Sequence, residues 1–225
     1  MWEENIEFAR EYGTLTDERD GKTYKTVVIG TQTWMAENLN YSDTTNYPSM
    51  KFRNWCYSNS LDSCAKYGRL YTWSAAMDSV GTFSTNGKGC GYLKTCSPTY
   101  PVRGIFPEGW HFPTKTEFET LFTTVGGKST AGKMLKSTTG WAEYYGENGN
   151  GVDAFGFNAI PASIRYNDGS FTDAGKSASF WSATWSATDY SGYRADFLSL
   201  SYRSEDAVLL FSSEGAAYSV RCLRD

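Results

Sequence analysis

The chain of 225 residues carries 21 Lys and Arg against 25 Asp and Glu, so its formal net charge is −4, and 16% of its residues are aromatic. Its apolar stretches are far shorter than the roughly 20 residues that a membrane-spanning helix needs. A slightly acidic chain also lacks the basic surface that duplex nucleic acid requires. The single histidine excludes a multi-histidine metal site. We therefore predict a folded protein that neither inserts into membranes nor binds nucleic acid.

The first part of the chain predicts a polar lead-in followed by a β-hairpin. Residues 1–19 are acidic, and Trp2, Ile6 and Phe8 indicate a short helix or an arm. Asp20-Gly21 signals a turn, and the runs at 22–29 and 32–39 predict two paired strands. The lead-in has no apolar segment typical of a signal peptide, so we expect an export signal to lie upstream of this stretch.

The cysteines indicate an oxidising compartment. Cys56 and Cys64 flank one short polar loop, and Cys90 and Cys96 flank another. Such loops suit local disulfides, and no C-x-x-C pair is present to bind zinc or exchange disulfides. Cys222 remains without a partner. The alternative, in which all five cysteines are free thiols of a cytosolic protein, stays open.

The middle of the chain combines irregular loops with helical patterns. Residues 41–68 predict an extended, cross-linked loop, and 81–104 a glycine-rich excursion. The apolar spacing over 69–80 predicts a helix. A stronger helix signal begins at Thr114, which forms a capping box with Glu117.

This second helix carries apolar residues at helical spacing. Phe118, Leu121, Phe122 and Val125 fall on one face, and Gly126 and Gly127 end the pattern. A short further helix is predicted around 131–136.

The last third of the chain predicts short antiparallel strands. Asn167-Asp168-Gly169 is a hairpin turn. Helices early and antiparallel strands late predict one α+β domain over 20–225, with two or three helices, a small twisted antiparallel sheet and long loops. The expected strands are 157–160, 163–166, 170–172, 179–184, 193–201, 207–212 and 218–223.

Six runs in the chain have a familiar order. They are GTQTWMAENLNY (30–41), CAKYGRLYTWSAAM (64–77), FPEGWHFPTKTEFETL (106–121), DAFGFNAIPASIRYNDGSF (153–171), FWSAT (180–184) and SVRC (219–222). Together they closely resemble the Fibrobacter succinogenes major paralogous domain family, from about Asp20 to the C-terminus. The resemblance implies a fold related to C-type lectin and formylglycine-generating-enzyme-like domains. It also implies a secreted or surface-attached bacterial protein, and it implies no activity.

One residue departs from the pattern of this family. Phe106 stands where relatives usually carry a cysteine before Pro-Glu-Gly-Trp. In lectin-like folds such a cysteine can bridge to the final strand, which here holds Cys222. The resemblance therefore implies that Cys222 is a free, buried thiol.

Catalytic constellations are weak in this sequence. His111, between Trp110 and Phe112, is the only imidazole, and no nucleophile elbow accompanies it. Glycoside hydrolysis needs a pair of carboxylates, and nothing singles out two of those available. We interpret the protein as non-catalytic, with a polysaccharide-acting enzyme as the alternative. The available carboxylates are Glu108, Glu117, Glu119, Glu143, Glu147, Asp153, Asp168 and Asp173.

Aromatic and amide residues in the later loops predict a binding surface. Rigid rings among Gly, Ser and Asn are typical of paratopes, and the alternative is that they anchor ordinary loops. We predict that the domain binds an extracellular glycan or surface protein, with a ligand-free display module as a third possibility. No cofactor is expected, although Glu147, Asn148, Asn150 and Asp153 offer oxygen ligands for calcium. The predicted contact residues are Trp141, Tyr144, Tyr145, Asn148, Asn150, Asp153, Trp185 and Tyr190.

Overall fold

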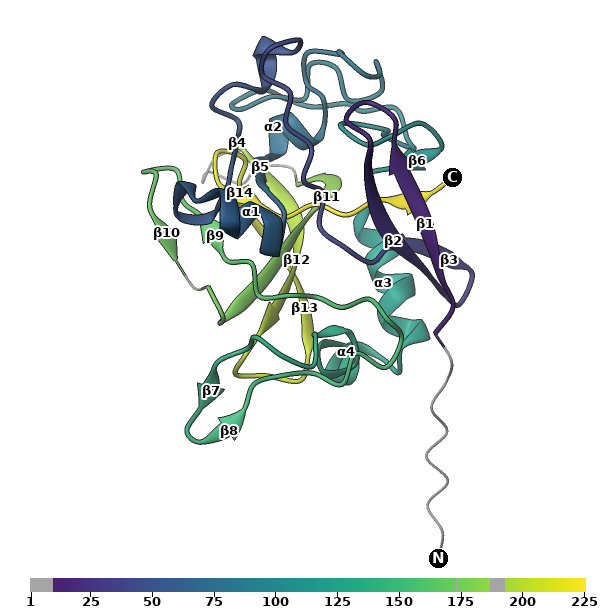
Figure 1. The fold of residues 1–225 in the computed structure, drawn as a ribbon. Coiled ribbons are helices and arrows are strands. Elements are labelled where there is room, and N and C mark those ends of the chain that lie inside the picture. The colour runs from purple at the N-terminus through teal and green to yellow at the C-terminus, as the bar shows by residue number, and fades with distance from the viewer. Residues whose placement is uncertain (1–9, 173, 187–192) are drawn as a thin grey trace, which may run out of the picture.

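Within residues 10–172, 174–186 and 193–225, which the structure describes, four antiparallel sheets combine with four α-helices (Figure 1). The structure is a computed structural model. Helices and antiparallel strands in one chain make an α+β architecture, as the sequence predicted. The prediction of two or three helices and one small sheet was wrong, because the described residues form four helices and four sheets. None of the helices in this described part has the length and apolar character that crossing a bilayer requires.

The first sheet joins both ends of the described chain. Its order is β1-β2-β3-β15-β6, so the last strand lies between the predicted hairpin and β6. The hairpin of β2 and β3 is confirmed, and β1, inside the expected lead-in, pairs with β2 along its whole length. Trp2, Ile6 and Phe8 lie outside the described residues. The strands are β1 (Tyr12–Asp17), β2 (Lys22–Ile29), β3 (Gln32–Met35), β6 (Trp110–His111) and β15 (Leu223–Arg224).

The second sheet brings the cysteine-rich region against the later hairpin. Its order is β10-β9-β14-β5-β4. The predicted turn at 167–169 connects β9 to β10, which pair as expected. Very short strands from four regions of the chain meet here, so the sheet depends on long-range contacts. The strands are β4 (Asn54–Trp55), β5 (Leu70–Thr72), β9 (Ile164–Arg165), β10 (Phe171–Thr172) and β14 (Ala217–Tyr218).

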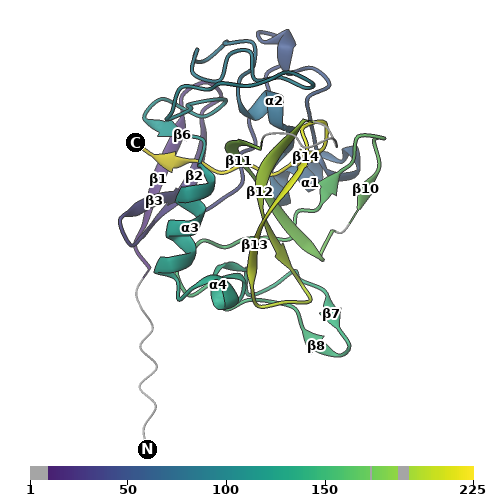
Figure 2. The ribbon, with the colours of Figure 1, turned by 180° about the vertical axis from the view of Figure 1, so that it is seen from behind.

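The third sheet consists of the long strands β11 (Ser177–Ser186), β12 (Arg194–Ser201) and β13 (Ala207–Ser213). Helices α3 (Lys115–Thr124) and α4 (Lys128–Leu135) lie against it (Figure 2). A separate hairpin of β7 (Glu143–Tyr144) and β8 (Glu147–Asn148) projects at the bottom of Figure 1. The strand expected at 157–160 does not form; only Ala159 makes an isolated bridge, to Lys136.

Helix α3 confirms the strongest local prediction. The Thr114 side chain accepts a hydrogen bond from the Glu117 amide, and the Glu117 carboxylate accepts one from the Thr114 amide. Its buried face packs into the core, where Phe118 stacks on Trp34 with ring centroids 5.3 Å apart.

Two local predictions in the middle of the chain were wrong. The helix expected over 69–80 is reduced to α2 (Trp73–Ala76), one turn that follows strand β5. The helix cannot continue through Asp78, whose φ is positive at 54°. The carboxylate of Asp78 accepts hydrogen bonds from the backbone amides of Thr82, Phe83 and Ser84. Conversely, the loop expected over 41–68 contains helix α1 (Leu61–Tyr67) and the 3-10 turns Pro48–Met50 and Tyr57–Asn59.

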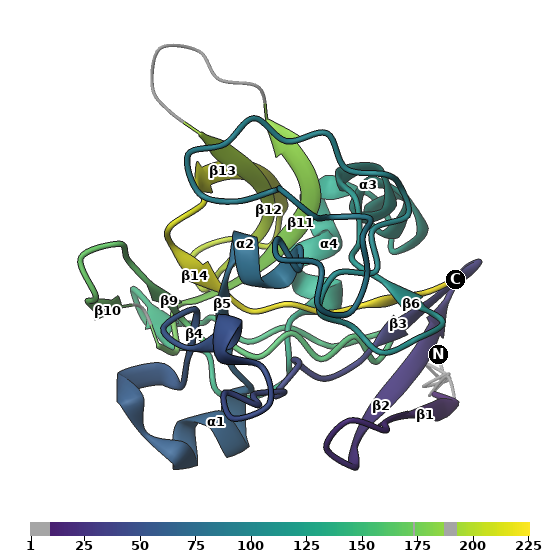
Figure 3. The same ribbon diagram turned by 90° about the horizontal axis from the view of Figure 1, so that it is seen from above.

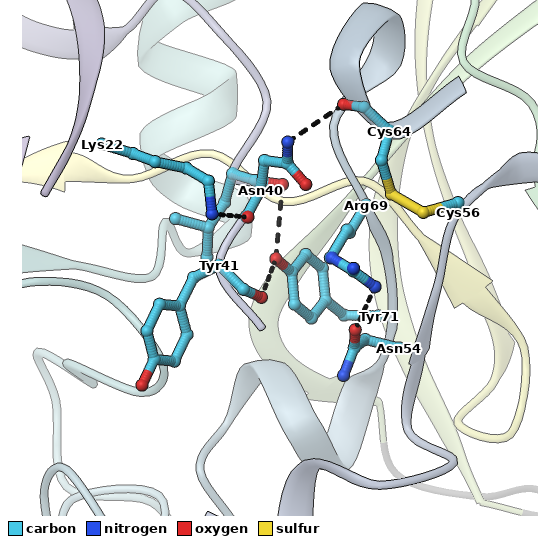
Figure 4. The surroundings of a disulfide bond; sticks show 9 residues. Lys22, Asn40, Tyr41, Asn54, Cys56, Cys64, Arg69 and Tyr71 are labelled. Atoms are coloured by element: carbon cyan, nitrogen blue, oxygen red, sulfur yellow. Dashed lines mark hydrogen bonds between the residues drawn. A yellow bond between two sulfur atoms is a disulfide. The ribbon is translucent and has the colours of Figure 1, made fainter. Parts of the chain in front are cut away.

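Both predicted disulfides are present. Cys56 pairs with Cys64, and Cys90 with Cys96. Figure 4 shows the surroundings of the first bridge: the Asn40 side-chain amide donates to the Cys64 carbonyl at 3.1 Å, and nearby the Tyr71 hydroxyl donates to the Tyr41 carbonyl at 2.8 Å. All five cysteines lie in described residues, and Cys222 is the one without a bridge; it is buried in the same core cluster as Phe106.

Candidate functional site

The structure divides the predicted contact residues into separate groups. Tyr144, Tyr145 and Asn148 lie on or beside the β7–β8 hairpin, and Asn150 follows it directly. Trp185 belongs to the far end of β11, which is ten residues long. At about 3.3 Å per residue, this strand separates Trp185 from the hairpin end of the sheet. Figure 3 shows β11 beside β12 and β13 from above. Tyr190 lies outside the described residues.

Two of the predicted residues are buried. Trp141 is only 6% exposed, and its indole N–H donates to the Ser137 hydroxyl and the Ala159 carbonyl. Asp153 is 5% exposed, and its carboxylate accepts a hydrogen bond from the Asn158 amide and faces Arg10. Both side chains make hydrogen bonds inside the fold, so they do not contribute to the accessible surface near the hairpin.

Beside the hairpin is a hollow of about 300 Å³, which we call the hairpin cleft. It is formed between the hairpin and the turn that joins β12 to β13, two segments about 50 residues apart in the sequence. Its walls combine rings, amides and both signs of charge. The lining residues are Lys133, Lys136, Tyr144, Glu147, Asn148, Asn150, Tyr202, Arg203, Ser204 and Glu205.

Aromatic rings form one side of the hairpin cleft. The Tyr144 ring lies 4.5 Å from that of Tyr145 and 5.6 Å from that of Tyr202, measured between centroids. The Arg203 guanidinium lies 5.1 Å from the centroids of both Tyr144 and Tyr202. Tyr145, at the tip, is 91% exposed. Tyr145 lies outside the lining of the cleft, so its exposed ring is available to contact a ligand at the edge of the cleft.

Backbone hydrogen bonds to their side-chain oxygens fix the orientation of Asn148 and Asn150. Asn148 Oδ1 accepts a hydrogen bond from the Asn150 amide at 3.0 Å, and Asn150 Oδ1 accepts one from the Trp141 amide at 2.9 Å. Neither side-chain NH₂ group donates a hydrogen bond to a described residue, so within this part of the chain each has two donors left for a ligand. Trp141 thus contributes to the cleft indirectly, through its backbone.

A buried lysine joins the two walls of the hairpin cleft. Lys136 Nζ donates to the carbonyls of Gly149, Ser201 and Ser204 at 2.8 to 3.0 Å. Burial lowers the pKa of Lys136, partly offset by Glu205 and Asp206. Because this ammonium satisfies three carbonyls from both walls, it sets the distance between the hairpin and the β12–β13 turn.

We expect Lys136→Met to destabilise the protein by about 3 kcal/mol, because it leaves three carbonyls without their charged donor. In a chain of this size that corresponds to a fall in melting temperature of roughly 6 to 12 °C. Thermal unfolding followed by circular dichroism measures it. Lys133→Met is the control: its ammonium is part-exposed and pairs with Glu205, so its loss should cost under about 1 kcal/mol. Equal losses for the two variants would contradict this role.

A larger hollow of about 500 Å³ lies on the cysteine-rich side of the molecule; we call it the Glu214 cleft. Its walls come from the loop before Cys56, the loop closed by Cys90 and Cys96, the β9–β10 hairpin and the turn after β13. The side chains that line it include Phe52, Arg53, Trp55, Tyr92, Lys94, Arg165, Asn167 and Glu214.

Glu214 is the unusual group in this cleft. It is 0% exposed, and neither carboxylate oxygen makes a hydrogen bond to any described residue. Burial raises its pKa to about 7, although the Leu93 backbone and the Trp185 indole lie near enough to oppose the shift. The predicted contact residue Trp185 therefore lies beside this cleft.

His111 lies between the carboxylates of Glu117 and Asp225. Its Nδ1 lies 2.7 Å from Asp225 Oδ1, and its Nε2 lies 2.9 Å from Glu117 Oε1. Burial alone lowers the pKa of His111, but the bonds to Glu117 and Asp225 outweigh it and raise the pKa above the usual value. Since both ring nitrogens are engaged, the imidazole is better suited to bracing the α3 N-terminus than to taking a proton from a substrate.

Metal ligands do not cluster in the part of the chain that the structure describes: no group of three or more His, Cys, Asp or Glu side chains is placed to share an ion. Of the four oxygen donors that suggested calcium, Asp153 is buried and bonded to Asn158. Glu147, Asn148 and Asn150 remain at the hairpin cleft, so calcium binding there stays a prediction.

Comparison with known proteins decides the family. The sequence model of the Fibrobacter succinogenes major domain matches residues 27–224, nearly the whole described fold from β2 to β15. The chain belongs to the Fibrobacter succinogenes major domain family. No curated protein and no solved structure matches the chain.

Both clefts lie inside the matched Fibrobacter succinogenes major domain, whereas β1 lies before it. Residues that line the Glu214 cleft went unnoticed in the sequence because Ser213-Glu214-Gly215 has the composition of an ordinary exposed turn. Tyr202 and Arg203 carried a detectable signal. They stand between two apolar strands in a polar run, which predicts a hairpin turn, but nothing local places that turn beside β7 and β8.

Proposed function

We propose that this Fibrobacter succinogenes major domain is a non-catalytic, C-type-lectin-like recognition domain that binds an extracellular glycan in the hairpin cleft. The observation that carries the proposal is the Tyr145 ring, 91% exposed beside the rings of Tyr144 and Tyr202 and beside amides with free donors. Flat rings with adaptable polar neighbours are what a sugar surface needs.

The chemistry of a pyranose fits the two sides of the hairpin cleft. Its C–H face packs on an aromatic ring and removes apolar area from water. Its hydroxyl groups accept from the NH₂ groups of Asn148 and Asn150 and donate to the carboxylate of Glu147. The half-exposed setting also leaves room for a longer chain to extend past the hairpin tip.

The disulfides support an extracellular location, which suits this function. They join cysteines that are eight and six positions apart, and such bridges persist in oxidising compartments. We therefore propose that the protein is secreted or held at the bacterial cell surface.

A polysaccharide-acting enzyme is the second candidate, and Glu214 is the observation that favours it. A carboxyl group with a pKa near 7 in a cleft has the property of a general acid. Hydrolysis by the usual mechanism needs a second carboxylate at 5 to 10 Å, and the described residues that line the cleft supply Glu214 alone. Release of reducing ends that is abolished by Glu214→Gln would favour the enzyme.

The test of the binding proposal is Tyr145→Ala. A glycan array selects a ligand, and isothermal titration calorimetry then compares the variant with the wild type. Removing the stacking ring should weaken binding about tenfold, close to 1.4 kcal/mol. Tyr12→Ala removes a ring that is also part-exposed, at 42%, but belongs to β1, and it should leave the affinity unchanged.

Two results would contradict this proposal. An unchanged affinity for the Tyr145→Ala variant would remove the hairpin cleft as the site. An array without any bound glycan would favour a protein partner or a display module that has no ligand.

A further inference from the structure

Three side chains at or beside the Glu214 cleft carry buried polar atoms that lack hydrogen-bond partners among the described residues. The four atoms are both carboxylate oxygens of Glu214, the indole nitrogen of Trp185 and the Nε of Arg165. Buried polar groups are normally hydrogen-bonded, and each exception costs free energy. The Trp185 indole lies near the Glu214 carboxylate, whereas Glu214 and Arg165 both line the hollow. Two such groups in one cleft indicate that a ligand there completes their hydrogen bonds.

From this cluster we propose that the Glu214 cleft is a second ligand site, separate from the hairpin cleft, and that it binds a sugar bearing a carboxylate, such as a hexuronic acid. Figure 1 places β4, β5 and β14, around which this cleft is built, well away from the β7–β8 hairpin. The proposal does not depend on glycan binding at the hairpin.

The charge of the cleft selects an anion. Arg53, Lys94 and Arg165 line it, opposed by the single carboxyl group of Glu214. The Arg53 guanidinium uses one nitrogen to donate to the Ser79 hydroxyl at 3.2 Å, which leaves the others for a ligand. Guanidinium groups bind carboxylates in a two-pronged geometry, so Arg53 is the residue we assign to the sugar carboxylate.

The aromatic groups favour a sugar acid over inorganic phosphate or a bare carboxylate. The Arg165 guanidinium carbon lies over the Trp55 ring, 3.8 Å from its centroid, while Tyr92 and Phe52 are 51% and 78% exposed. These surfaces suit the apolar face of a pyranose. The carboxyl group of Glu214 then exchanges a hydrogen bond with a ring hydroxyl, an interaction that an anion without hydroxyl groups does not provide.

Two disulfides and a hydrogen bond hold the walls of the Glu214 cleft in place independently of any ligand. Trp55 precedes Cys56 directly, and Tyr92 and Lys94 belong to the loop closed by Cys90 and Cys96. Asn167 donates from its side chain to the Ser213 hydroxyl at 3.0 Å, which ties the β9–β10 turn to the segment that carries Glu214. A preformed site loses less conformational entropy on binding, and its volume of about 500 Å³ lies in the usual range for ligand pockets.

The experiment titrates the whole chain with digalacturonic acid, and with the neutral galactose disaccharide as the matched probe, by NMR and calorimetry. We expect the acid to bind at least tenfold more tightly than the neutral sugar. Arg53→Gln should weaken acid binding at least tenfold, whereas Arg224→Gln, which removes an exposed arginine on β15, should not. Lys94→Gln, on an exposed loop, gives a second reading if Arg53→Gln impairs folding; it should weaken acid binding several-fold.

Equal affinity for both disaccharides, or equal affinity of the wild type and both cleft variants for the acid, would overturn the proposal. Tyr145→Ala separates the two sites: it should leave binding of the acid unchanged. If it abolished that binding, the ligand would occupy the hairpin cleft and the Glu214 cleft would not be the site.

Discussion

Arg221→Met should lower the free energy of unfolding by about 3 to 5 kcal/mol, the largest effect we expect from a single substitution. Arg221 is 1% exposed, yet each of the three nitrogens of its guanidinium donates a hydrogen bond. It donates to Asn38 Oδ1 at 2.8 Å, to the Asn158 carbonyl at 2.9 Å and to the Phe157 carbonyl. Methionine fills a similar volume but leaves these three acceptors buried without a donor.

The surroundings of Arg221 add packing to these hydrogen bonds. Its guanidinium lies 4.5 Å from the Phe157 ring centroid and 5.0 Å from that of Phe180. Burial lowers its pKa to about 9, with Asp153 and Glu37 opposing the shift. The side chain is therefore still protonated at pH 7, and its charge strengthens the hydrogen bonds that it donates.

Urea denaturation followed by tryptophan fluorescence measures the loss. Arg224→Met is the control, because Arg224 is exposed three residues further along, in β15, and its replacement should change stability by under about 0.5 kcal/mol. Arg221→Lys keeps a charge but loses the planar fork, so it should fall between the two. If Arg221→Met were as stable as the control, the buried network would not support the fold.

Glu214→Gln should stabilise the protein at alkaline pH, in contrast to most substitutions of buried residues. The pKa of Glu214 rises from 4.5 in the unfolded chain to about 7 in the folded protein. Between these values the folded protein holds one more proton than the unfolded chain, so stability falls as the pH rises, and the loss is complete above pH 7. At about 1.36 kcal/mol per pKa unit, the loss is roughly 3 kcal/mol. Glutamine is neutral at every pH and avoids it.

Melting temperatures from pH 4.5 to 8.5 test this expectation. The variant should melt roughly 6 to 12 °C above the wild type at pH 8.5, and the difference should shrink toward pH 4.5. The His111–Glu117 pair also titrates, since the pKa of His111 is raised and that of Glu117 lowered, but both proteins contain it and it cancels. Glu119→Gln, at an exposed position on α3, should show no such trend. A constant difference at all pH values would refute the assignment.

The interactions that involve near neighbours could be read from the sequence. The capping box of Thr114 and Glu117 spans three residues, and the two disulfides span eight and six. The hairpin of β2 and β3 likewise depends on one short turn. Such features need only local geometry, and the order of six motifs along the chain was sufficient to indicate the family.

Helix α2 shows where local reasoning reached its limit. Its apolar spacing extends from residue 69 to 80, but the carboxylate of Asp78 binds the following backbone amides and ends the helix after one turn. Trp141 is a second case. It stands in a Gly- and Asn-rich segment typical of exposed loops, yet its ring is buried in a hydrophobic cluster with distant residues such as Trp34 and Phe180. Its N–H donates to the Ser137 hydroxyl and the Ala159 carbonyl.

The sequence by itself determined the family, the cysteine pairing, the capped helix and the presence of aromatic and amide residues around the β7–β8 hairpin. Only the tertiary structure decided which of those residues face solvent, and that Tyr202, Arg203 and the buried carboxyl group of Glu214 contribute to clefts. The reason is physical: burial and pKa depend on atoms brought together by strand pairings across up to nearly 200 positions, such as β15 with β3, and no local pattern records which distant segments will meet.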